Sequence, residues 1–424
     1  MEKSGNYLTK VVFKEQINAR DFLTFIPKSQ QIALQKAAAF LQGKRVVHLN
    51  ATGKGGGVAE ILKSLIPYLR ALGVQSDWYF INPRAGKKFF NVTNKIHNAL
   101  QGSDAGILPD DWKEYERVSK LVAKDIDAID CDVLAVNDPQ VLLAGVLAVT
   151  KPNKIFFSHI DTSGANKETA KKLSDFINSY CKVVFSNRRF VYKKIPRGKT
   201  KIFTPAIDPL SPKQHIVSRH EARRYLKTHG GIPENGPLVV QVSRFDVWKN
   251  PMGVVEAFRI VQQTYPNAKL ALVGFNEAVD NPLSLAVYKD IQMIAREKKD
   301  IFCFFYPKGK QVTEFTTMAQ NAADVVVQNS IKEGFGLTVT EAMFKGQPVV
   351  GGPASGIKKQ IVNGKNGLIA GDSYLLARDI IFLLSNSAKR KAMGKAAQKS
   401  VMKQFLFPRL VLDHLTLYQS CLKK

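Results

Sequence analysis

The sequence predicts an α/β protein built from two doubly wound domains. Its 424 residues exceed what one hydrophobic core of ordinary size accommodates, so two domains fit better than one. Short β-rich runs alternate with amphipathic stretches, which is typical of parallel sheets covered by helices. The alternation occurs twice, and a proline-rich stretch between Lys201 and Pro237 separates the two series. We therefore expect one domain over residues 1–205 and a second over residues 206–424.

The first series begins with a strand candidate, RVVHLNA at 45–51, that a glycine loop joins to a helical pattern. In that pattern apolar residues recur at the spacing of a helix with one face on a sheet; they are Val58, Ile61, Leu62, Leu65, Ile66, Leu69 and Leu72. The helical pattern KETAKKLSDFINSY follows at 167–180. The other strand candidates are DWYFIN (77–82), VLAVND (133–138), KIFFSHID (154–161) and VVFSN (183–187).

The second series repeats this organisation after the proline-rich stretch. Its strand candidates are PLVVQVS (237–243), KLALVGF (269–275), IFCFFYP (301–307), DVVVQNS (324–330) and QPVVGGP (347–353). Helical patterns lie between them at 252–265, 285–299 and 312–322. Ligands of such sheets bind at the carboxyl ends of the strands, so we expect the two domains to face each other across a cleft. The stretch from Ala388 is helical in pattern and is a candidate to pack back across the first domain.

The composition is that of a globular protein. The chain is 45% apolar and 23% charged, and no run approaches the roughly 18 apolar residues of a transmembrane helix. We expect a cytoplasmic protein with no transmembrane segment. The four cysteines, Cys131, Cys181, Cys303 and Cys421, form no CxxC pair, which favours buried or idle thiols over a zinc site or a disulfide framework.

The chain is strongly basic. Lys and Arg outnumber Asp and Glu by 62 to 35, for a formal charge of +27, which raises the affinity for polyanions. The excess is scattered, with its densest run from Arg188 to Lys201, and it matches no recognisable nucleic-acid module. We therefore favour a solvated basic surface over a dedicated nucleic-acid site.

A glycine loop, Gly53-Lys54-Gly55-Gly56-Gly57, lies between a predicted strand and a predicted helix. Backbone N–H groups there, together with the helix N-terminus, can face a phosphate. A Walker loop would need a Gly-Lys-Ser/Thr ending, which is absent, and a dinucleotide fingerprint would need a small residue at Val58. The remaining alternatives are a phosphate site and a plain glycine turn.

Two cations follow the first strand of the second series. Arg244 and Lys249 stand five positions apart in QVSRFDVWK, at the strand's carboxyl end. Arg offers a fork of donors and Lys a point charge, so the two can neutralise a diphosphate leaving group. A surface salt-bridge pair is the alternative.

The segment from Asn329 to Glu341 contains two carboxylates around a glycine-flanked loop. Glu333 precedes a predicted helix, and Glu341 lies inside it. Such a loop offers free amides to a phosphate or sugar, while one carboxylate can hold sugar hydroxyls and the other a ribose. Glu333 can also stabilise the helix start without any ligand, but that reading does not explain the glycines.

As a set, these motifs resemble the family-4 retaining glycosyltransferases of the two-domain GT-B type, whose two Rossmann-like domains face each other across a cleft. More narrowly, GGGVAEILKSLIPYLRALG, FFNVTNKIHNALQG, SHIDTS, QVSRFDVWKNP and EGFGLTVTEAMFKGQPVVG are similar to segments of the trehalose glycosyltransferring synthases, which join glucose from a nucleotide donor to free glucose. The similarity runs from about Val46 to Ala370, and the N-terminal 45 residues are less distinctive.

The resemblance implies a role for each matching residue. Arg244 and Lys249 would hold the diphosphate and Glu341 the ribose. Glu333, with the backbone of Phe335, Gly336 and Leu337, would hold the transferred sugar and its phosphate. Gly56 and Gly57 would lie near the donor phosphates, and His159 and Asp161 would line the sugar pocket. Ser158, Thr162 and Lys54 differ from the residue types expected in the synthases, which leaves the acceptor more open than the donor.

The resemblance also implies a mechanism and partners. Transfer would occur on the front side of the donor, with the leaving diphosphate helping to deprotonate the acceptor, and no protein nucleophile would be needed. The donor would be ADP-, UDP- or GDP-glucose and the acceptor a small sugar, and a homodimer is a candidate assembly. No cofactor is required, although Mg²⁺ can accompany the nucleotide. The acidic pair Asp130 and Asp132 precedes a strand and is more simply a turn than a metal site.

Three other functions stay open at this point. A trehalose phosphorylase has related motifs but uses inorganic phosphate in place of a nucleotide. A transferase with a lipid or protein acceptor would use the positive charge for membrane attachment. A non-catalytic protein that binds nucleotide or nucleic acid would not need the carboxylate of Glu333.

Overall fold

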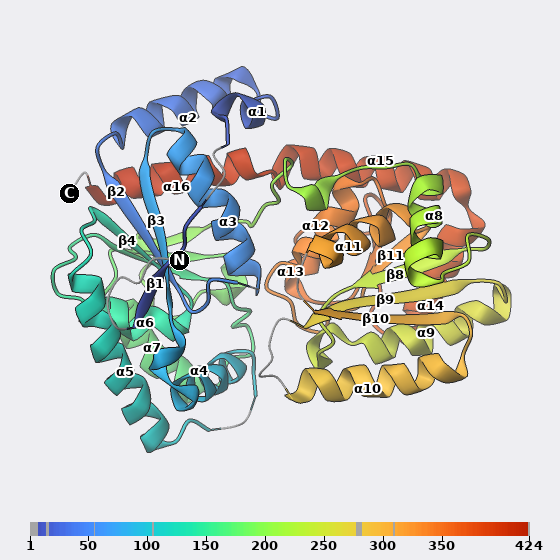
Figure 1. The fold of residues 1–424 in the computed structure, drawn as a ribbon, viewed down its shortest axis with the longest axis horizontal. Helices are drawn as coiled ribbons and strands as arrows, with labels where there is room; N and C mark the ends of the chain where they lie inside the picture. Colours follow the sequence, from blue (N-terminus) through green and yellow to red (C-terminus); the bar gives the residue numbers. More distant parts are fainter. Residues whose placement is uncertain are drawn as a thin grey trace. The chain divides into compact units, whose positions relative to one another are not determined.

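The computed structural model describes residues 7–13, 17–54, 56–103, 106–276, 282–307 and 310–422. Contacts divide the chain into two compact units (Figure 1). Residues 1–205 and 407–424 form the first unit, and residues 206–406 form the second. The sequence predicts a boundary between residues 205 and 206, with a C-terminal helical stretch that is a candidate to pack back on the first domain, and contacts group residues 407–424 with the first unit.

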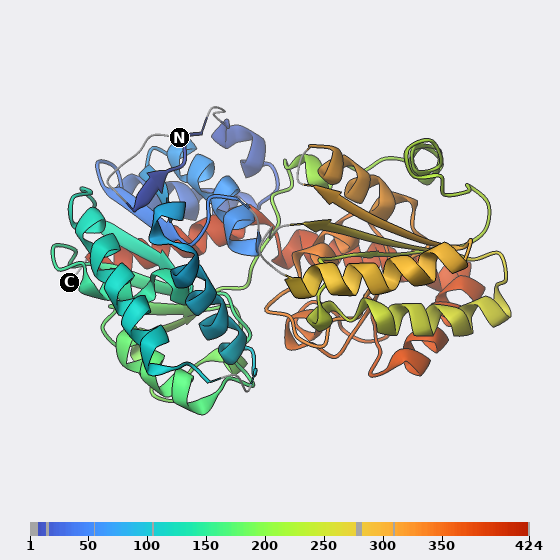
Figure 2. The ribbon, with the colours of Figure 1, turned by 60° about the horizontal axis from the view of Figure 1, so that its bottom comes forward.

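The first unit contains a seven-stranded sheet in the order β1-β3-β2-β4-β5-β6-β7. Its strands pair in parallel, except that β1 is antiparallel to β3. Helices α4 to α7 cover one face, and α2, α3 and α16 lie over the other (Figures 1 and 2). The strands are β1 (Leu8–Lys10), β2 (Arg45–Asn50), β3 (Gln75–Ile81), β4 (Val133–Asn137), β5 (Lys154–Ser158), β6 (Lys182–Phe185) and β7 (Thr200–Ile202). The helices are α1 (Ala19–Leu23), α2 (Lys28–Phe40), α3 (Gly56–Ala71), α4 (Lys87–Leu100), α5 (Pro109–Asp127), α6 (Pro139–Leu147), α7 (Lys167–Ile177) and α16 (Phe407–Leu422).

The second unit contains a six-stranded parallel sheet in the order β10-β9-β8-β11-β12-β13. Helices α9, α10 and α14 lie over one face, and α8, α11, α12 and α15 lie over the other (Figure 1). The strands are β8 (Leu238–Val242), β9 (Lys269–Asn276), β10 (Ile301–Pro307), β11 (Val325–Gln328), β12 (Val349–Gly351) and β13 (Leu368–Ile369). The helices are α8 (Arg219–Gly230), α9 (Pro251–Thr264), α10 (Pro282–Glu297), α11 (Lys310–Ala322), α12 (Leu337–Phe344), α13 (Ser355–Lys358), α14 (Ser373–Ser385) and α15 (Ser387–Gln404).

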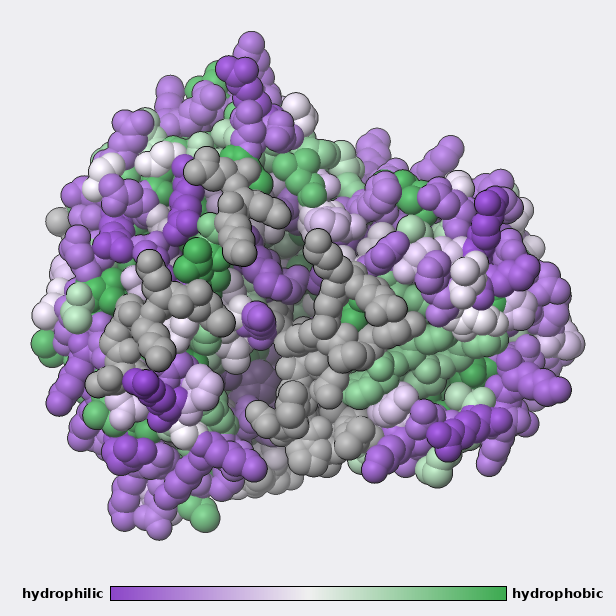
Figure 3. Space-filling view, viewed as in Figure 1, coloured by the Kyte–Doolittle hydropathy of each residue, from purple (hydrophilic) through white to green (hydrophobic). Residues whose placement is uncertain are grey.

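The α/β fold class expected from the sequence is confirmed. Every strand candidate is present, because strands buried on both faces of a parallel sheet need nearly continuous apolar runs. The sequence did not indicate β1, β7 and β13, which are the shortest strands at sheet edges. Hydrophilic side chains dominate the face drawn in Figure 3, as the charged composition leads one to expect.

The two ends of the chain complete the first unit. β1 adds an antiparallel edge strand beside β3, and α2 packs along α16. The helical stretch expected from Ala388 is two helices, of which α15 belongs to the second unit and α16 to the first. Helix α16 buries apolar residues such as Leu410, Val411 and Leu415, so it is part of the first unit's core.

Candidate functional site

The loops after β8 and β11 bring the predicted donor-side residues together. These two strands are parallel neighbours, so their carboxyl ends meet at the same edge of the sheet. The first loop carries Arg244 and Lys249, and the second carries Glu333. The N–H of Ile331 donates to the carbonyl of Trp248 at 2.8 Å, which joins the two loops directly.

Lys249 and Glu333 form an ion pair at this edge. The Lys249 Nζ lies 2.5 Å from the Glu333 Oε2, and the two side chains are only 14% and 15% exposed. Shielding from water strengthens such a pair relative to an exposed one. The arrangement places a cation and a carboxylate side by side, which can serve phosphate oxygens and sugar hydroxyls respectively.

Asp246 fixes the loop that carries both cations. Its Oδ1 accepts hydrogen bonds from the N–H groups of Trp248 at 3.0 Å and Lys249 at 3.1 Å. Its Oδ2 lies 3.0 Å from the Arg244 guanidinium, which is 46% exposed. Asp246 was not among the site residues predicted from the sequence, although an Asp whose side chain accepts hydrogen bonds from N–H groups two and three residues later is a helix-capping signal.

Glycines allow the loop of Glu333 to lie close to its neighbours. Gly336 has φ of +88°, and a Cβ there would lie 3.1 Å from the Glu333 Cγ. A Cβ at Gly356 would lie 2.6 Å from both the Glu333 carbonyl oxygen and the Phe335 Cα. Side chains at these two positions would therefore displace the loop.

Gln360 holds the start of α12, and sequence analysis did not single it out. Its Nε2 donates to the carbonyls of Phe335 at 2.5 Å and Gly336 at 3.2 Å, while its Oε1 accepts from the Thr340 hydroxyl at 2.6 Å. Helix α12 begins at Leu337, and the half-buried Glu341 lies within it, as expected. First-turn amides have no carbonyl partner within a helix, so this end suits an anion.

The glycine loop of the first unit follows β2 and leads into α3. A Cβ at Gly53 would lie 2.5 Å from the Phe80 ring, so packing explains that glycine. Packing does not explain Gly57, which begins α3 with Gly56 and would place its Cβ in open space. Gly55 lies outside the described residues.

His159 follows β5 in the first unit. Its backbone N–H donates to the Asp138 Oδ1 at 2.8 Å, and its Nε2 lies 3.1 Å from the Asn137 Oδ1. The Asn137 amide donates to the Leu49 carbonyl, so the amide oxygen faces the imidazole and His159 must donate from Nε2. Burial lowers the pKa of His159. The ring is therefore neutral at pH 7, with Nδ1 left as an acceptor.

Asp161 lies two residues beyond His159 and is buried, with 3% of its surface exposed. Its Oδ1 accepts hydrogen bonds from the Ser163 N–H at 3.0 Å and the Ser163 hydroxyl at 2.6 Å. These bonds close the turn that leads toward α7. The carboxylate therefore shapes the loop after His159.

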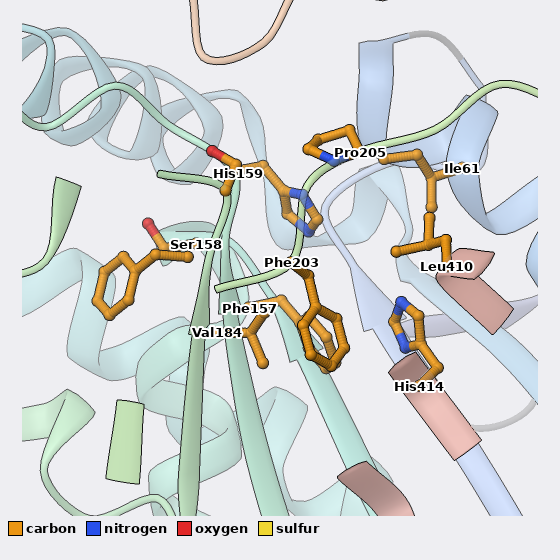
Figure 4. Close-up of a pocket in the computed structure, with 11 residues that line it drawn as sticks. Ile61, Phe157, Ser158, His159, Val184, Phe203, Pro205, Leu410 and His414 are labelled. Carbon is orange, nitrogen blue, oxygen red and sulfur yellow. The ribbon is translucent and has the colours of Figure 1, made fainter. Parts of the chain in front are cut away.

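His159 lines a small pocket with aromatic and histidine side chains from β5, from the loop before Pro205 and from α16 (Figure 4). The space is about 20 Å³, which is about the room that one water molecule needs. The ring of Phe157 stacks with His159 on one side at 6.3 Å between centroids and with His414 at 5.1 Å. Helix α16 thus reaches the residue that follows β5.

His414, which lines this pocket, also belongs to a hydrogen-bonded group of three buried side chains. The Tyr418 hydroxyl lies 2.8 Å from the His48 Nε2 and 2.8 Å from the His414 Nδ1. The Tyr418 hydroxyl has one proton, which it donates to one of the two imidazoles. The other imidazole donates its N–H to the hydroxyl oxygen. Burial, and then the nearby His159, lowers the pKa of His48 to about 3, and burial also lowers the pKa of His414 well below its usual value. Both rings are therefore neutral.

The residues that the structure describes include neither a metal-binding cluster nor a membrane-spanning helix. They contain no group of three or more His, Cys, Asp or Glu side chains placed to hold a metal ion. None of their helices is both long enough and apolar enough to cross a membrane.

Each unit has its own sheet, parallel throughout in the second unit and parallel except for β1 in the first, and this two-domain arrangement is that of the GT-B fold. Two family models match the chain: "Trehalose synthase, N-terminal domain" over residues 48–192 and "Glycosyl transferases group 1" over residues 223–400. The HepE protein of Anabaena, solved with UDP and glucose, has this fold, with a TM-score of 0.66 at 17% identity over 89% of this chain and 99% of that one.

Curated relatives narrow the class. The chain is 36% identical to the trehalose synthase of Pyrococcus horikoshii over 94% of this chain and 95% of that protein. It is also 36% identical to the trehalose synthase of Rubrobacter xylanophilus over 95% of this chain and 96% of that protein. The trehalose phosphorylase of Pleurotus pulmonarius is more distant, at 25% identity over 87% of this chain and 56% of that protein. The chain belongs to the trehalose synthase family of hexosyltransferases, as the resemblance predicted.

Proposed function

We propose that this enzyme transfers glucose from a nucleotide donor to free glucose, with retention of configuration, and so makes α,α-trehalose. The family supports a trehalose-related glycosyl transfer, and the donor, the acceptor and the stereochemistry are our inference. The observation that carries the proposal is the shielded Lys249–Glu333 ion pair beside the glycine-flanked start of α12.

In the second unit, the proposal assigns the nucleotide sugar to the loops after β8 and β11. Arg244 and Lys249 would hold the diphosphate, and Glu341 the ribose. Glu333 and the backbone of Phe335, Gly336 and Leu337 would hold the glucose and its phosphate. The exposed Arg244 would adjust its position to the diphosphate, whereas the shielded Lys249 would offer a charge at a fixed position.

In the first unit, the proposal assigns phosphate contacts to Gly56 and Gly57 and sugar contacts to His159 and Asp161. The Nδ1 of His159, which is an acceptor in this tautomer, would accept a hydrogen bond from a sugar hydroxyl, which a protonated ring would not do. Asp161 would act mainly by holding the loop, because Ser163 already occupies one of its oxygens.

In the proposed reaction, the bond between the anomeric carbon and the diphosphate breaks, and the acceptor oxygen bonds to the same face of that carbon. The departing nucleoside diphosphate takes the acceptor's proton. Arg244 and Lys249 would stabilise the negative charge that develops on the diphosphate, and Glu333 would orient the glucose. No covalent intermediate with the protein is needed.

Product analysis tests the proposal. The protein is incubated with UDP-, ADP- and GDP-glucose, each with and without free glucose. We expect nucleotide release that depends on glucose, together with a non-reducing disaccharide. The proposal would be contradicted if none of the three donors released nucleotide.

Two further incubations, one of trehalose with and without phosphate and one of the nucleotide sugars with a lipid or protein acceptor, separate the alternatives. A phosphorylase would cleave trehalose only when inorganic phosphate is present, and the more distant relation to a phosphorylase keeps this second candidate in the test. A transferase with another acceptor would release nucleotide on addition of a lipid or protein but not of glucose.

Three further points belong to the proposal. Catalysis would require no protein-bound metal, and Mg²⁺ would enter only with the nucleotide; activity that persists in excess EDTA would agree with this. The enzyme would work in the cytoplasm. It would also form a homodimer, and sedimentation of the purified protein can test that oligomeric state.

A further inference from the structure

Two cysteines that are 240 positions apart in the sequence lie against each other in the first unit. Cys181 directly precedes β6, and Cys421 lies near the end of α16. Their sulfur atoms are 3.1 Å apart. The sequence favoured buried or idle thiols here and gave no sign of this proximity, since it depends on where α16 packs.

Both cysteines stand on well-anchored backbone. The N–H of Cys181 donates to the Lys154 carbonyl at 2.9 Å. Helix α16 is held near Cys421 by Gln419, whose Nε2 donates to the Ala37 carbonyl of α2 at 3.0 Å, and by the buried Tyr418. The two sulfurs are therefore held in proximity by the fold and not by a mobile terminus.

We propose that Cys181 and Cys421 form a reversible disulfide that ties α16 to the sheet of the first unit. Bonded sulfurs are about 2.05 Å apart, so the two must approach by about 1 Å, which small side-chain rotations can supply. This inference is independent of the proposed sugar donor and acceptor.

The solvent exposure of the two thiols indicates which cysteine reacts first with an oxidant. Cys421 is 2% exposed, whereas Cys181 is half-buried, so a reagent meets Cys181 first. The hydrogen bond with Cys181, together with burial, raises the pKa of the Cys421 thiol, which disfavours Cys421 as the first nucleophile.

The oxidant we propose is a low-molecular-weight disulfide. The Cys181 thiolate attacks one of its sulfurs and releases one small thiol, which leaves a mixed disulfide on Cys181. Cys421 then loses its proton, attacks the Cys181 sulfur and releases the second small thiol. Two protein thiols are oxidised by two electrons, and the small disulfide is reduced to two thiols.

The bond would enclose the entire second unit. The chain passes from the first unit to the second after Pro205 and returns after Leu406, and both passages lie between Cys181 and Cys421. A cross-link across so long a loop restricts the unfolded chain and keeps α16 on the first unit.

The test uses the full chain treated with oxidised glutathione, followed by peptide mapping without reduction and by thermal unfolding. We expect one cross-linked peptide pair containing Cys181 and Cys421, which dithiothreitol separates, and a midpoint raised by at least about 5 °C. Cys181→Ser and Cys421→Ser should each abolish both effects, whereas the matched controls Cys131→Ser and Cys303→Ser should keep them.

Three results would overturn the proposal: a glutathione adduct that never resolves, a cross-link that includes Cys131 or Cys303, or an unchanged midpoint in the cross-linked protein. The peptide map of the wild-type chain gives the answer even if a serine variant fails to fold.

Discussion

Single side chains in the second unit hold backbone segments in place. Asp246 accepts two loop N–H groups while it pairs with Arg244, and Gln360 binds two carbonyls at the start of α12. Neither residue has a proposed contact with the sugar. Both fix the positions of the residues that do, and positional precision of this kind is what transfer without a protein nucleophile requires.

Glu333→Gln tests the central ion pair. The amide keeps the shape of the side chain but removes its charge, so Lys249 loses its partner and the proposed sugar loses a strong acceptor. We expect kcat to fall by about 100-fold or more. The matched control is Glu234→Gln, which breaks the exposed Lys227–Glu234 pair of 3.1 Å and should leave activity unchanged. An activity for Glu333→Gln within tenfold of wild type would contradict the assigned role.

Gly336→Ala tests the close approach of the loop. The positive φ should cost about 1–2 kcal/mol of stability, and the new Cβ would press on Glu333. Gly364→Ala is the control, because Gly364 has φ of +78° and no atom within 4 Å of its Cβ position. We expect both variants to lose stability in urea but only Gly336→Ala to lose kcat/KM. Equal activities would show that the contact with Glu333 is unimportant.

At the scale of elements, α16 contributes an apolar face and two members of a buried polar group. Leu410, Val411 and Leu415 pack into the first unit, and His414 and Tyr418 meet His48 from β2. The hydrogen bonds of this group require both imidazoles to be neutral. The free energy of unfolding of the first unit therefore depends on pH.

We expect the first unit to lose stability as the pH falls below about 6.5. The pKa of His48 is about 3 in the folded chain and near 6.5 in an unfolded chain, so protons bind preferentially to the unfolded state in between. From pH 7.5 to pH 5.5, His48 alone should lower the free energy of unfolding by about 1.4 kcal/mol, and His414 acts in the same direction. Carboxylates with lowered pKa, such as Asp77, lose their contribution only at lower pH.

Urea unfolding at the two pH values measures this effect. The loss should be smaller in His48→Gln, whose side chain has no proton to gain. A free energy that is the same at pH 7.5 and pH 5.5 would rule out the buried neutral histidines as the cause.

At the scale of the whole molecule, the chain crosses between its units twice. The first unit is completed by residues that follow the second unit in the sequence. The net charge of +27 is spread over the chain and belongs to no single element. We therefore expect the first unit to complete its fold only when residues 407–424 are present, whereas the second unit is continuous in sequence.

A chain that ends at Leu406 tests this dependence. Without α16 the first unit exposes the apolar residues that the helix covers, so its calorimetric transition should be lost or shifted down by more than about 10 °C. The transition of the second unit should persist, which serves as the internal control. A truncated chain with both transitions intact would show that α16 is dispensable.

The sequence alone predicted the class of fold and most of the sheet. Interior strands such as β4 and β11 are buried on both faces, so they must be continuous apolar runs and are visible without a structure. The edge strands β1, β7 and β13 were missed, because an edge strand of two or three residues pairs on one side only and leaves no such run. The motif around Glu333 was also visible, since glycines and carboxylates at a helix start have a recognisable spacing.

Tertiary structure alone decided which distant residues meet. The Lys249–Glu333 pair, the support from Gln360 and the contact of Cys181 with Cys421 each join segments far apart in the chain. The return of α16 to the first unit places His414 beside Phe157. Periodicity and local motifs report only which face of an element is buried. The neighbour across that face is chosen by packing over the whole fold, and a local pattern contains no information about it.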